Sequence, residues 1–400
     1  MKKSLLILLI VINTLIMMAF TFYLMKLPWL ASDEKFLIWS TTALNFANRE
    51  RPDSEDFALI NTSYDLQLID RYDEFGFPVG NQAITERQKL ALLFEIIHNA
   101  ADKPKYIITD IHFVDSSAHD QALATQLNQL ENVILSAHIN EEGSLEKPIF
   151  NEVDYGISDY LIGSAFDGVY KYQLIYNDTA KLLPLKVHEK LSRQNSKKLG
   201  PFVKVGSKWT MNNFIMNYRI LQKDIYDAEA GFNPVSLGEL LYLTDEDIQE
   251  FTANKIVVIG DFFENDMHET VLEITSGPLI LLNALLTIQE EDTILNVWFL
   301  LFMAIAYGYL SYLAFVEGDV IENRINKITS KKFTKYIAGF ASYFLLLTAL
   351  SLTTYWIFNI HINVFFIAIA FYIIDRIAGI LIYSKRKVLK KIMNSGETNS

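Results

Sequence analysis

The sequence predicts a membrane protein that carries an α/β domain outside the cytoplasm and four transmembrane α-helices, one N-terminal and three C-terminal. Three observations support this fold class: long apolar runs at both ends of the 400-residue chain, basic residues concentrated beside those runs, and an alternation of apolar strands with amphipathic helices between them. Continuous apolar strands separated by helices are typical of a mixed, largely parallel sheet with helices on both faces.

The first transmembrane helix is predicted over residues 4–26. Residues 4–25 contain no charged side chain, and crossing the hydrocarbon core of a bilayer takes roughly 20 apolar residues. The apolar part of a secretory signal peptide is shorter, about 7–15 residues, and ends at a small-x-small cleavage site. Here the run continues to Lys26 without such a site. We therefore interpret it as an uncleaved signal anchor, with a cleaved signal peptide as the alternative.

Three further apolar runs near the C-terminus predict the remaining helices, over 294–316, 336–358 and 361–383. Positively charged residues in short loops mark the cytoplasmic side of a membrane. Four helices place three segments on the same side of the membrane, 1–3, 317–335 and 384–400, and each carries Lys or Arg. The turn at 359–361, on the other side, carries neither. The 27–293 domain is therefore predicted to lie in the periplasm. The helices are predicted to cross a bacterial inner membrane, with both termini of the chain in the cytoplasm.

The predicted cytoplasmic segments are a short N-terminal piece, a basic loop and a basic tail, none longer than 19 residues. Chains below about 40 residues rarely fold without disulfides, metals or oligomerisation. We therefore expect no catalytic domain on the cytoplasmic side and no enzymatic activity. Any cytoplasmic output is expected to come from a separate protein.

The composition narrows the function further. The chain has no cysteine, which excludes a disulfide scaffold, a cysteine-ligated zinc or iron–sulfur site and a cysteine nucleophile. Residues 27–316 contain 42 acidic and 21 basic side chains, so no nucleic acid is expected as a partner. Solubility in the envelope explains this acidic charge, and a cationic or metal ligand is the alternative interpretation.

Strands and helices alternate along the predicted outer domain. A buried strand is predicted at 57–61 and a second at 106–111. Between them, the capping box Thr85-x-x-Gln88 precedes apolar residues at helical spacing and predicts a helix.

The rest of the domain continues this pattern. Ser117-x-x-Asp120 resembles the cap of another helix, and a strand follows at 133–136. The middle of the domain is less patterned, with one strand expected at 169–176. The last two elements are a strand at 255–260, which ends in glycine, and an apolar helix at 277–290.

Several segments are similar to a known family. They read ITDIHFVD (108–115), FDGVYKYQLI (166–175), KIVVIGDFFENDMHET (255–270) and SGPLILLNALL (276–286). With Asp120-x-x-Leu123-Ala124 behind the first, they resemble the CHASE type 2 domain, the extracytoplasmic sensory module of bacterial cyclase and histidine-kinase receptors. The predicted topology is also similar to that family's. The resemblance implies a sensory role, although such receptors usually continue into a catalytic output domain, which we do not expect here.

Polar side chains follow two of the predicted strands. In open α/β sheets, ligands collect beyond the carboxyl ends of the strands, and the groups converge there if the two strands are neighbours. We call these residues the strand-end cluster: Asp110, His112, Asp115, Asp120, Asp261, Asp266, His268 and Thr270.

Three interpretations of the strand-end cluster are open. In the first it is structural, and Asp110 and Asp261 accept backbone N–H groups at helix starts, so replacing either with Asn would lower stability. In the second its carboxylates and imidazole hold a divalent cation, for which Asp110, Asp261, Asp266 and His268 are weak candidates. In the third it binds a small ligand. No catalytic residue, resident metal or cofactor is predicted.

One charged pair, Asp375-Arg376, interrupts the last apolar run. It lies roughly 13 Å inside the predicted cytoplasmic edge, a depth at which an ionised side chain is costly. We interpret the pair as a contact surface with another helix. In the alternatives, Arg376 extends to the headgroups, or the membrane helix ends near Ile374 and the remainder lies along the interface.

Three classes of function are compatible with these features. The first is a receptor-like membrane protein that senses an envelope signal, or binds a protein, and relays it through its helices to a separate subunit. The second is a structural or scaffold subunit of an envelope complex, and the third an extracytoplasmic enzyme, which the motifs favour least. The expected partners are the lipid bilayer and either a membrane or cytoplasmic signalling protein or a second copy of this chain in a homo-oligomer.

Overall fold

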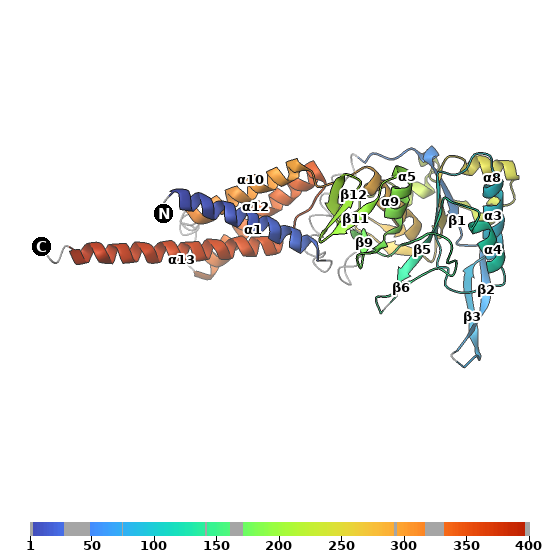
Figure 1. The fold of residues 1–400 in the computed structure, drawn as a ribbon, viewed down its shortest axis with the longest axis horizontal. Helices are drawn as coiled ribbons and strands as arrows, with labels where there is room; N and C mark the ends of the chain where they lie inside the picture. The colour runs from blue at the N-terminus through green and yellow to red at the C-terminus, as the bar shows by residue number, and fades with distance from the viewer. Residues whose placement is uncertain are drawn as a thin grey trace. The chain divides into compact units, whose positions relative to one another are not determined.

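The computed structural model describes residues 3–27, 49–73, 75–140, 142–160, 171–291, 294–316 and 332–396. The chain divides into two compact units (Figure 1). The membrane unit is built from the two ends of the chain, 1–41 and 294–400, and the α/β domain from residues 42–293.

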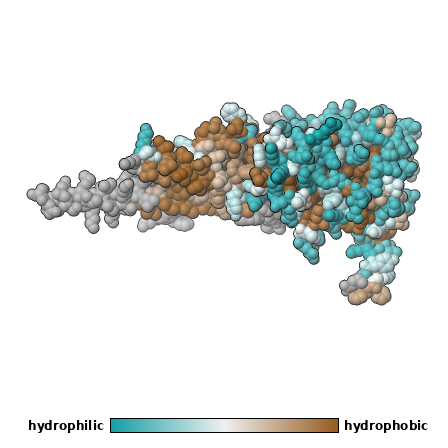
Figure 2. Space-filling view, in the orientation of Figure 1, coloured by the Kyte–Doolittle hydropathy of each residue, from teal (hydrophilic) through white to brown (hydrophobic). Residues whose placement is uncertain are grey.

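In the described part of the membrane unit the helices are α1 (Lys3–Met25), α10 (Val297–Val316), α12 (Lys332–Phe358) and α13 (Val364–Gly396). Within the part of the chain that the structure describes, α1, α10 and α12 are long and apolar enough to cross a membrane, and Figure 2 shows an apolar surface over them. They correspond to three of the predicted transmembrane helices. Helix α13 continues without a break through Asp375 and Arg376 to Gly396. Most of the predicted 317–335 loop lies outside the described residues.

Helices α1 and α10 pack together through buried polar contacts. Asn13 Nδ2 donates a hydrogen bond to Ser311 Oγ over 2.8 Å, and the Thr21 and Tyr307 hydroxyls bond each other over 2.8 Å. Hydrogen bonds between membrane helices contribute about 0.6 kcal/mol on average. These contacts therefore set the register of α1 on α10 and add modestly to its stability.

A largely parallel sheet forms the centre of the α/β domain. Its strand order is β15–β1–β16–β4–β5–β6, with β7 also paired to β5, and every pair is parallel except β5–β6. The strands are β1 (Phe57–Asn61), β4 (Tyr106–Asp110), β5 (Val133–Ile139), β6 (Leu145–Glu146), β7 (Tyr155–Ile157), β15 (Val235–Ser236) and β16 (Ile256–Gly260). The predicted strands at 57–61, 106–111, 133–136 and 255–260 are therefore confirmed.

Helices cover both faces of this sheet. They are α3 (Arg87–Asn99), α4 (Asp120–Leu127), α5 (Leu183–Ser192), α6 (Gln222–Tyr226), α7 (Leu237–Leu240), α8 (Asp245–Thr252) and α9 (Gly277–Gln289), with short 3-10 helices at Ser54–Asp56 and Ala228–Ala230.

The apolar residues of each strand divide between two cores because successive side chains point to opposite faces. On β16, Ile256 and Val258 join the core that contains α5 and α9. Val257 and Ile259 join the core that contains α3, α4 and α8. The prediction of a mixed, largely parallel sheet covered on both faces is confirmed.

Smaller sheets surround this frame. They are the hairpin of β2 (Leu66–Tyr72) and β3 (Pro78–Thr85), the three-stranded sheet of β11 (Ser196–Leu199), β12 (Phe202–Val205) and β13 (Lys208–Met211), and the pairs β8 (Lys171–Gln173) with β14 (Asn213–Ile215), β9 (Ile175–Tyr176) with β10 (Ala180–Lys181), and β17 (Met267–Glu269) with β18 (Ile274–Ser276). The β2–β3 hairpin, which the sequence pattern did not predict, projects from the domain in Figure 1.

Two local predictions are wrong. The single strand expected at 169–176 is, over its described residues, two short strands, β8 and β9, in different sheets. The capping box at Thr85 does not form, because Thr85 is the last residue of β3 and pairs with Leu66. Helix α3 instead begins at Arg87 after Glu86, without a side-chain cap. Thr85 is therefore part of the β2–β3 hairpin and does not act as the N-cap of α3.

Candidate functional site

A cavity of about 580 Å³ opens at the carboxyl edge of the sheet. Six members of the strand-end cluster line it: Asp110, His112, Asp115, Asp261, Asp266 and His268. The other lining residues come mainly from the β2–β3 hairpin, β5, the segment after β7, and α9, and include Gln82, His138, Ser158, Asp159, Tyr160 and Tyr172. Asp120 and Thr270 do not line it.

The sheet register explains why these side chains meet. Gly260 of β16 pairs with Asn61 of β1 on one side and with Asp110 of β4 on the other. A Cβ on Gly260 would lie 3.0 Å from the Asp110 carbonyl oxygen and 2.5 Å from Cγ of Pro278. The absent side chain thus allows the start of α9 to approach the sheet edge closely.

Asp266 lies directly over the start of α9. The Gly277 N–H donates to its backbone carbonyl over 2.8 Å, and a Cβ on Gly277 would collide with its carboxylate. A carboxylate beside the N-terminus of a helix is favourable because the helix dipole is positive there. Gly277, the first residue of α9, therefore leaves the space that the Asp266 carboxylate occupies in the cavity.

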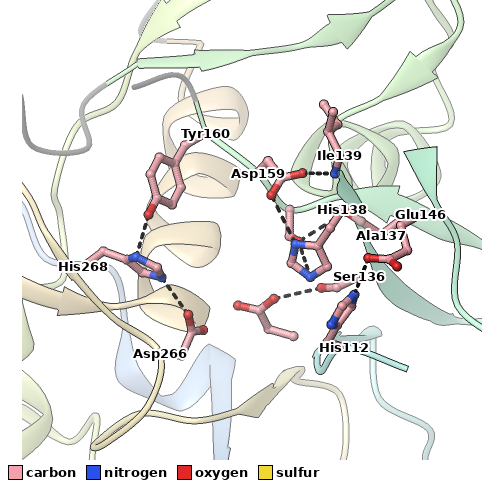
Figure 3. Close-up of polar contacts among 12 residues, drawn as sticks. His112, Ser136, Ala137, His138, Ile139, Glu146, Asp159, Tyr160, Asp266 and His268 are labelled. Atoms are coloured by element: carbon pink, nitrogen blue, oxygen red, sulfur yellow. Dashed lines mark hydrogen bonds and ion pairs between the residues drawn. The ribbon is translucent and has the colours of Figure 1, made fainter. Parts of the chain in front are cut away.

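Two imidazoles inside the cavity are each oriented by a carboxylate (Figure 3). His268 Nε2 lies 2.6 Å from Asp266 Oδ1, and its Nδ1 lies 2.5 Å from the Tyr160 hydroxyl. Because a carboxylate only accepts hydrogen bonds, His268 Nε2 carries the ring proton and donates it to Asp266, and the Tyr160 hydroxyl donates to His268 Nδ1. Burial, with the charges of Asp266 and Asp159, raises the pKa of Tyr160 to about 12, which keeps the hydroxyl a donor.

His138 faces Asp159 on the other side of the cavity, with Nδ1 3.1 Å from Oδ1. The second oxygen of Asp159 accepts the Ile139 N–H over 2.5 Å. Burial by itself lowers the pKa of His138, but the bond to Asp159 and the charges of Asp159, Asp110 and Asp266 outweigh it and raise the pKa. His112, at the rim, lies 3.1 Å from Glu146 and stacks edge-on against His138.

Asp110 has the most perturbed carboxyl group of the cavity. Burial, together with the charge of Asp266, raises its pKa to about 7, although the Ser136 hydrogen bond and the charges of His138 and His268 act in the opposite direction. Ser136 Oγ donates to Asp110 Oδ1 over 2.8 Å. The expected backbone N–H donors to Asp110 are absent among the described residues, because Asp110 still belongs to β4 and no helix follows directly.

Asp261 has the opposite environment. Its carboxylate accepts the N–H groups of Phe263, Glu264 and Asn265 over 2.8–3.0 Å and the hydroxyl of Ser63. Burial alone would raise the pKa of Asp261, but these hydrogen bonds outweigh it and lower the pKa. Asp261 therefore holds the loop after β16, and its N–H donors come from this loop where a helix start was expected.

The three remaining cluster members have local hydrogen bonds. Asp115 accepts from Gln82 Nε2 over 2.8 Å, which joins the β2–β3 hairpin to the loop after β4. Asp120 accepts the Ser117 N–H over 2.6 Å at the start of α4. Thr270 Oγ1 donates to the Glu273 carbonyl over 2.6 Å and holds the β17–β18 turn.

The cavity is acidic. Its described lining residues include five carboxylates, of Asp110, Asp115, Asp159, Asp261 and Asp266, and neither lysine nor arginine. No group of three or more His, Asp and Glu side chains in the described ranges is arranged to hold a metal ion. His138 and His268 each direct one ring nitrogen toward a carboxylate of the cavity.

The model of the CHASE2 domain matches residues 11–315, about three quarters of the chain. The chain belongs to the CHASE2 family. Searches of curated proteins and of solved structures found no match. The protein is thus a membrane protein with a CHASE2 extracytoplasmic sensory domain and apolar helices. Of the segments that carried the resemblance, 166–170 lie outside the described residues, and 108–115, 171–175 and 255–286 contribute to the cavity or its surroundings.

Sequence reasoning missed several residues of the CHASE2 cavity. His138 lies near the end of β5, which extends three residues beyond the predicted strand, so the rule that located Asp110 would have found it. Asp159 and Tyr160 follow β7, a strand of three residues in the weakly patterned middle of the domain. Tyr172 belongs to β8, outside the main sheet, and no local signal marks it.

The Asp375-Arg376 pair lies on α13, facing α12. Arg376 Nε donates to the Tyr372 hydroxyl over 3.1 Å, and its Nη2 would lie 3.6 Å from a Cβ on Gly339 of α12. Asp375 lies within electrostatic range of Tyr343, also on α12. Both charged side chains are half-buried.

Proposed function

We propose that this CHASE2 protein is a receptor-like subunit whose cavity binds an envelope signal. Its helices relay the resulting conformational change to a separate partner. The cavity carries this proposal: it is large enough for a small ligand, since ligand sites typically measure about 300–1,000 Å³, and it lies in a domain of a sensory family. The relay has a physical route, because the two ends of the domain lead into α1 and α10, which pack together through buried polar contacts.

The proposed topology places the α/β domain in the periplasm and both termini in the cytoplasm. The basic residues beside the helices support this orientation. We include α13 as a fourth transmembrane helix, since residues 364–380 are apolar apart from Asp375 and Arg376. The proposed partner is a membrane or cytoplasmic signalling protein, or a second copy of this chain.

We further propose that the domain has no enzymatic activity. Ser158, His138 and Asp159 have the residue types of a hydrolase triad, but Ser158 Oγ lies 3.4 Å from both ring nitrogens of His138. Equal distances place the oxygen beside Cε1, away from the lone pair of either nitrogen, and a general base acts at about 2.6–3.2 Å. This geometry supports binding over proton transfer.

A distance measurement in the full chain tests the relay. Because the natural sequence has no cysteine, Ile7→Cys on α1 and Ile305→Cys on α10, both exposed, take two spin labels specifically. In nanodiscs, the small-molecule fraction of an envelope extract should shift the distance between the labels. Ala83→Trp, which places a large side chain on the cavity wall, should abolish the shift, and Leu92→Trp on the exposed side of α3 should retain it.

Two results would contradict the relay: an unchanged distance in the chain with the natural cavity, or an equal shift in the Ala83→Trp variant. The second candidate function, a scaffold subunit, predicts the first of these.

The β2–β3 hairpin favours the scaffold function, because Leu68, Phe75 and Phe77 are 70%, 76% and 66% exposed there, and Figure 2 shows apolar surface at its tip. Exposed apolar groups of this kind mark contacts between proteins.

The Asp375-Arg376 pair is proposed as a contact surface within the membrane unit. Asp375→Leu should weaken the packing of α13 on α12 and reduce the recovery of folded protein in mild detergent. Ile373→Leu, at an exposed position of the same helix, is the control. Equal recovery of both variants would argue against the contact surface.

A further inference from the structure

Carboxylates predominate among the charged groups that line the cavity. Asp110 accepts one hydrogen bond, on Oδ1 from Ser136, and its Oδ2 has no donor among the described residues. Each inner imidazole directs one ring nitrogen to a carboxylate, His138 to Asp159 and His268 to Asp266. A ligand that enters must therefore supply donors, because a buried carboxylate without them is costly.

The Tyr172 hydroxyl is a second, independent indication of a ligand. Tyr172 is 1% exposed and lines the cavity, yet its hydroxyl forms no hydrogen bond with any described residue. The hydroxyl lies within electrostatic range of Asp110 and Asp266. A buried tyrosine hydroxyl usually has a hydrogen-bond partner. The cavity therefore has room for a polar ligand group beside the Tyr172 hydroxyl, near Asp110 and Asp266.

We propose that the cavity binds a small organic cation through a primary ammonium group, which donates hydrogen bonds to Asp110 and to the Tyr172 hydroxyl. The rings of Tyr160 and Tyr172 provide an aromatic wall that a cation favours. This inference rests on the proposed function in one respect, since it takes the cavity as the place where the signal binds.

Other ligand classes fit the same observations less well. An anion would be repelled, because the described lining contains five carboxylates and no lysine or arginine. A neutral polyol would leave the carboxylate charge of Asp110 uncompensated. A bare metal ion would need a set of three ligands, which the described residues do not form, and would leave most of the 580 Å³ empty.

Calorimetric titration of the full chain in nanodiscs tests the ligand class. The probes are putrescine and spermidine, with 1,4-butanediol as the uncharged analogue of putrescine and Mg²⁺ as the metal control, all at pH 8 and physiological salt. We expect saturable one-site binding of the two amines and none of the diol. Binding of the diol as tight as that of putrescine, binding of neither amine, or displacement of putrescine by Mg²⁺ at equimolar concentration would overturn the proposal.

Three variants locate the binding. Asp110→Asn should weaken putrescine binding at least about tenfold, because it removes a charged acceptor. Tyr172→Phe removes only the hydroxyl and should weaken binding about threefold or more, which keeps the test decisive if Asp110→Asn fails to fold. Glu250→Gln makes the same charge change at an exposed position of α8, and should bind like the natural chain. Equal weakening by Glu250→Gln and Asp110→Asn would overturn the proposal.

The label-distance experiment separates this failure from failure of the proposed function. If envelope extract shifts the α1–α10 distance and the amines do not bind, the ligand class is wrong and the relay stands. If the amines bind as expected and the distance does not change, the ligand class stands and the relay is wrong.

Discussion

Replacing Asp110 with Asn should make the α/β domain more stable at pH 8, although the same change is expected to weaken ligand binding. The raised pKa of Asp110 means that the folded state holds this proton more tightly than the unfolded chain does. Stability therefore falls as pH rises from the ordinary value of 3.8 toward 7, where the folded carboxyl ionises. Asn retains an acceptor for the Ser136 hydroxyl but never ionises.

The magnitude follows from the two pKa values, 3.8 and about 7. At about 1.36 kcal/mol for each pH unit between them, the ionised carboxylate costs about 4 kcal/mol above pH 7. Asp110 is half-buried and borders an open cavity, so solvent screening reduces this figure. We expect Asp110→Asn to gain about 2–4 kcal/mol at pH 8 and nothing at pH 4.

Melting temperatures of the full chain in nanodiscs, measured at several pH values, provide the assay. For a domain of this size 1 kcal/mol shifts the melting temperature by about 2–4 °C, so the variant should melt at least about 4 °C higher at pH 8. His138, whose pKa is also raised, adds stability below its ordinary pKa that is lost as pH rises. This contribution is smaller in the variant, because the charge of Asp110 is one cause of the raised pKa. A variant that is less stable at pH 8, or a difference that does not change with pH, would refute this account of Asp110.

Three further predictions follow from other parts of the structure. Asp261→Asn should destabilise the domain by about 1–3 kcal/mol in urea-dependent pulse proteolysis at pH 7, because the loop after β16 loses a charged acceptor; a change below about 0.3 kcal/mol would count against this. Gly277→Ala should cost a similar amount, since its methyl group collides with the Asp266 carboxylate, and retention of the natural melting temperature would mean that α9 adjusts freely. An impermeant thiol reagent applied to intact spheroplasts should label Ser207→Cys, at an exposed turn of the α/β domain, and spare Ser330→Cys; labelling of Ser330→Cys would reverse the proposed topology.

Asp110 and Asp261 show why strand-end residues can be located from sequence but not assigned a role. Both carboxylates follow an apolar strand, and the sequence interpretation treated them alike. In the structure, Asp261 accepts the N–H groups of its own loop, while Asp110 remains in β4 within electrostatic range of Asp266. The difference depends on neighbours that are distant in sequence, and it reverses the expected effect of an Asn substitution.

The sequence by itself determined the apolar helices, the four central strands and the helices on both faces of the sheet. These features depend on local requirements: the thickness of a bilayer sets the length of an apolar run, and a strand buried on both faces must be apolar throughout. The tertiary structure alone decided the order β1–β16–β4–β5, which brings Asp110, His138 and Asp266 to one cavity. It also decided the places of Tyr160 and Tyr172, because parallel strands are joined by long crossover connections, and which strands become neighbours depends on how those connections pack.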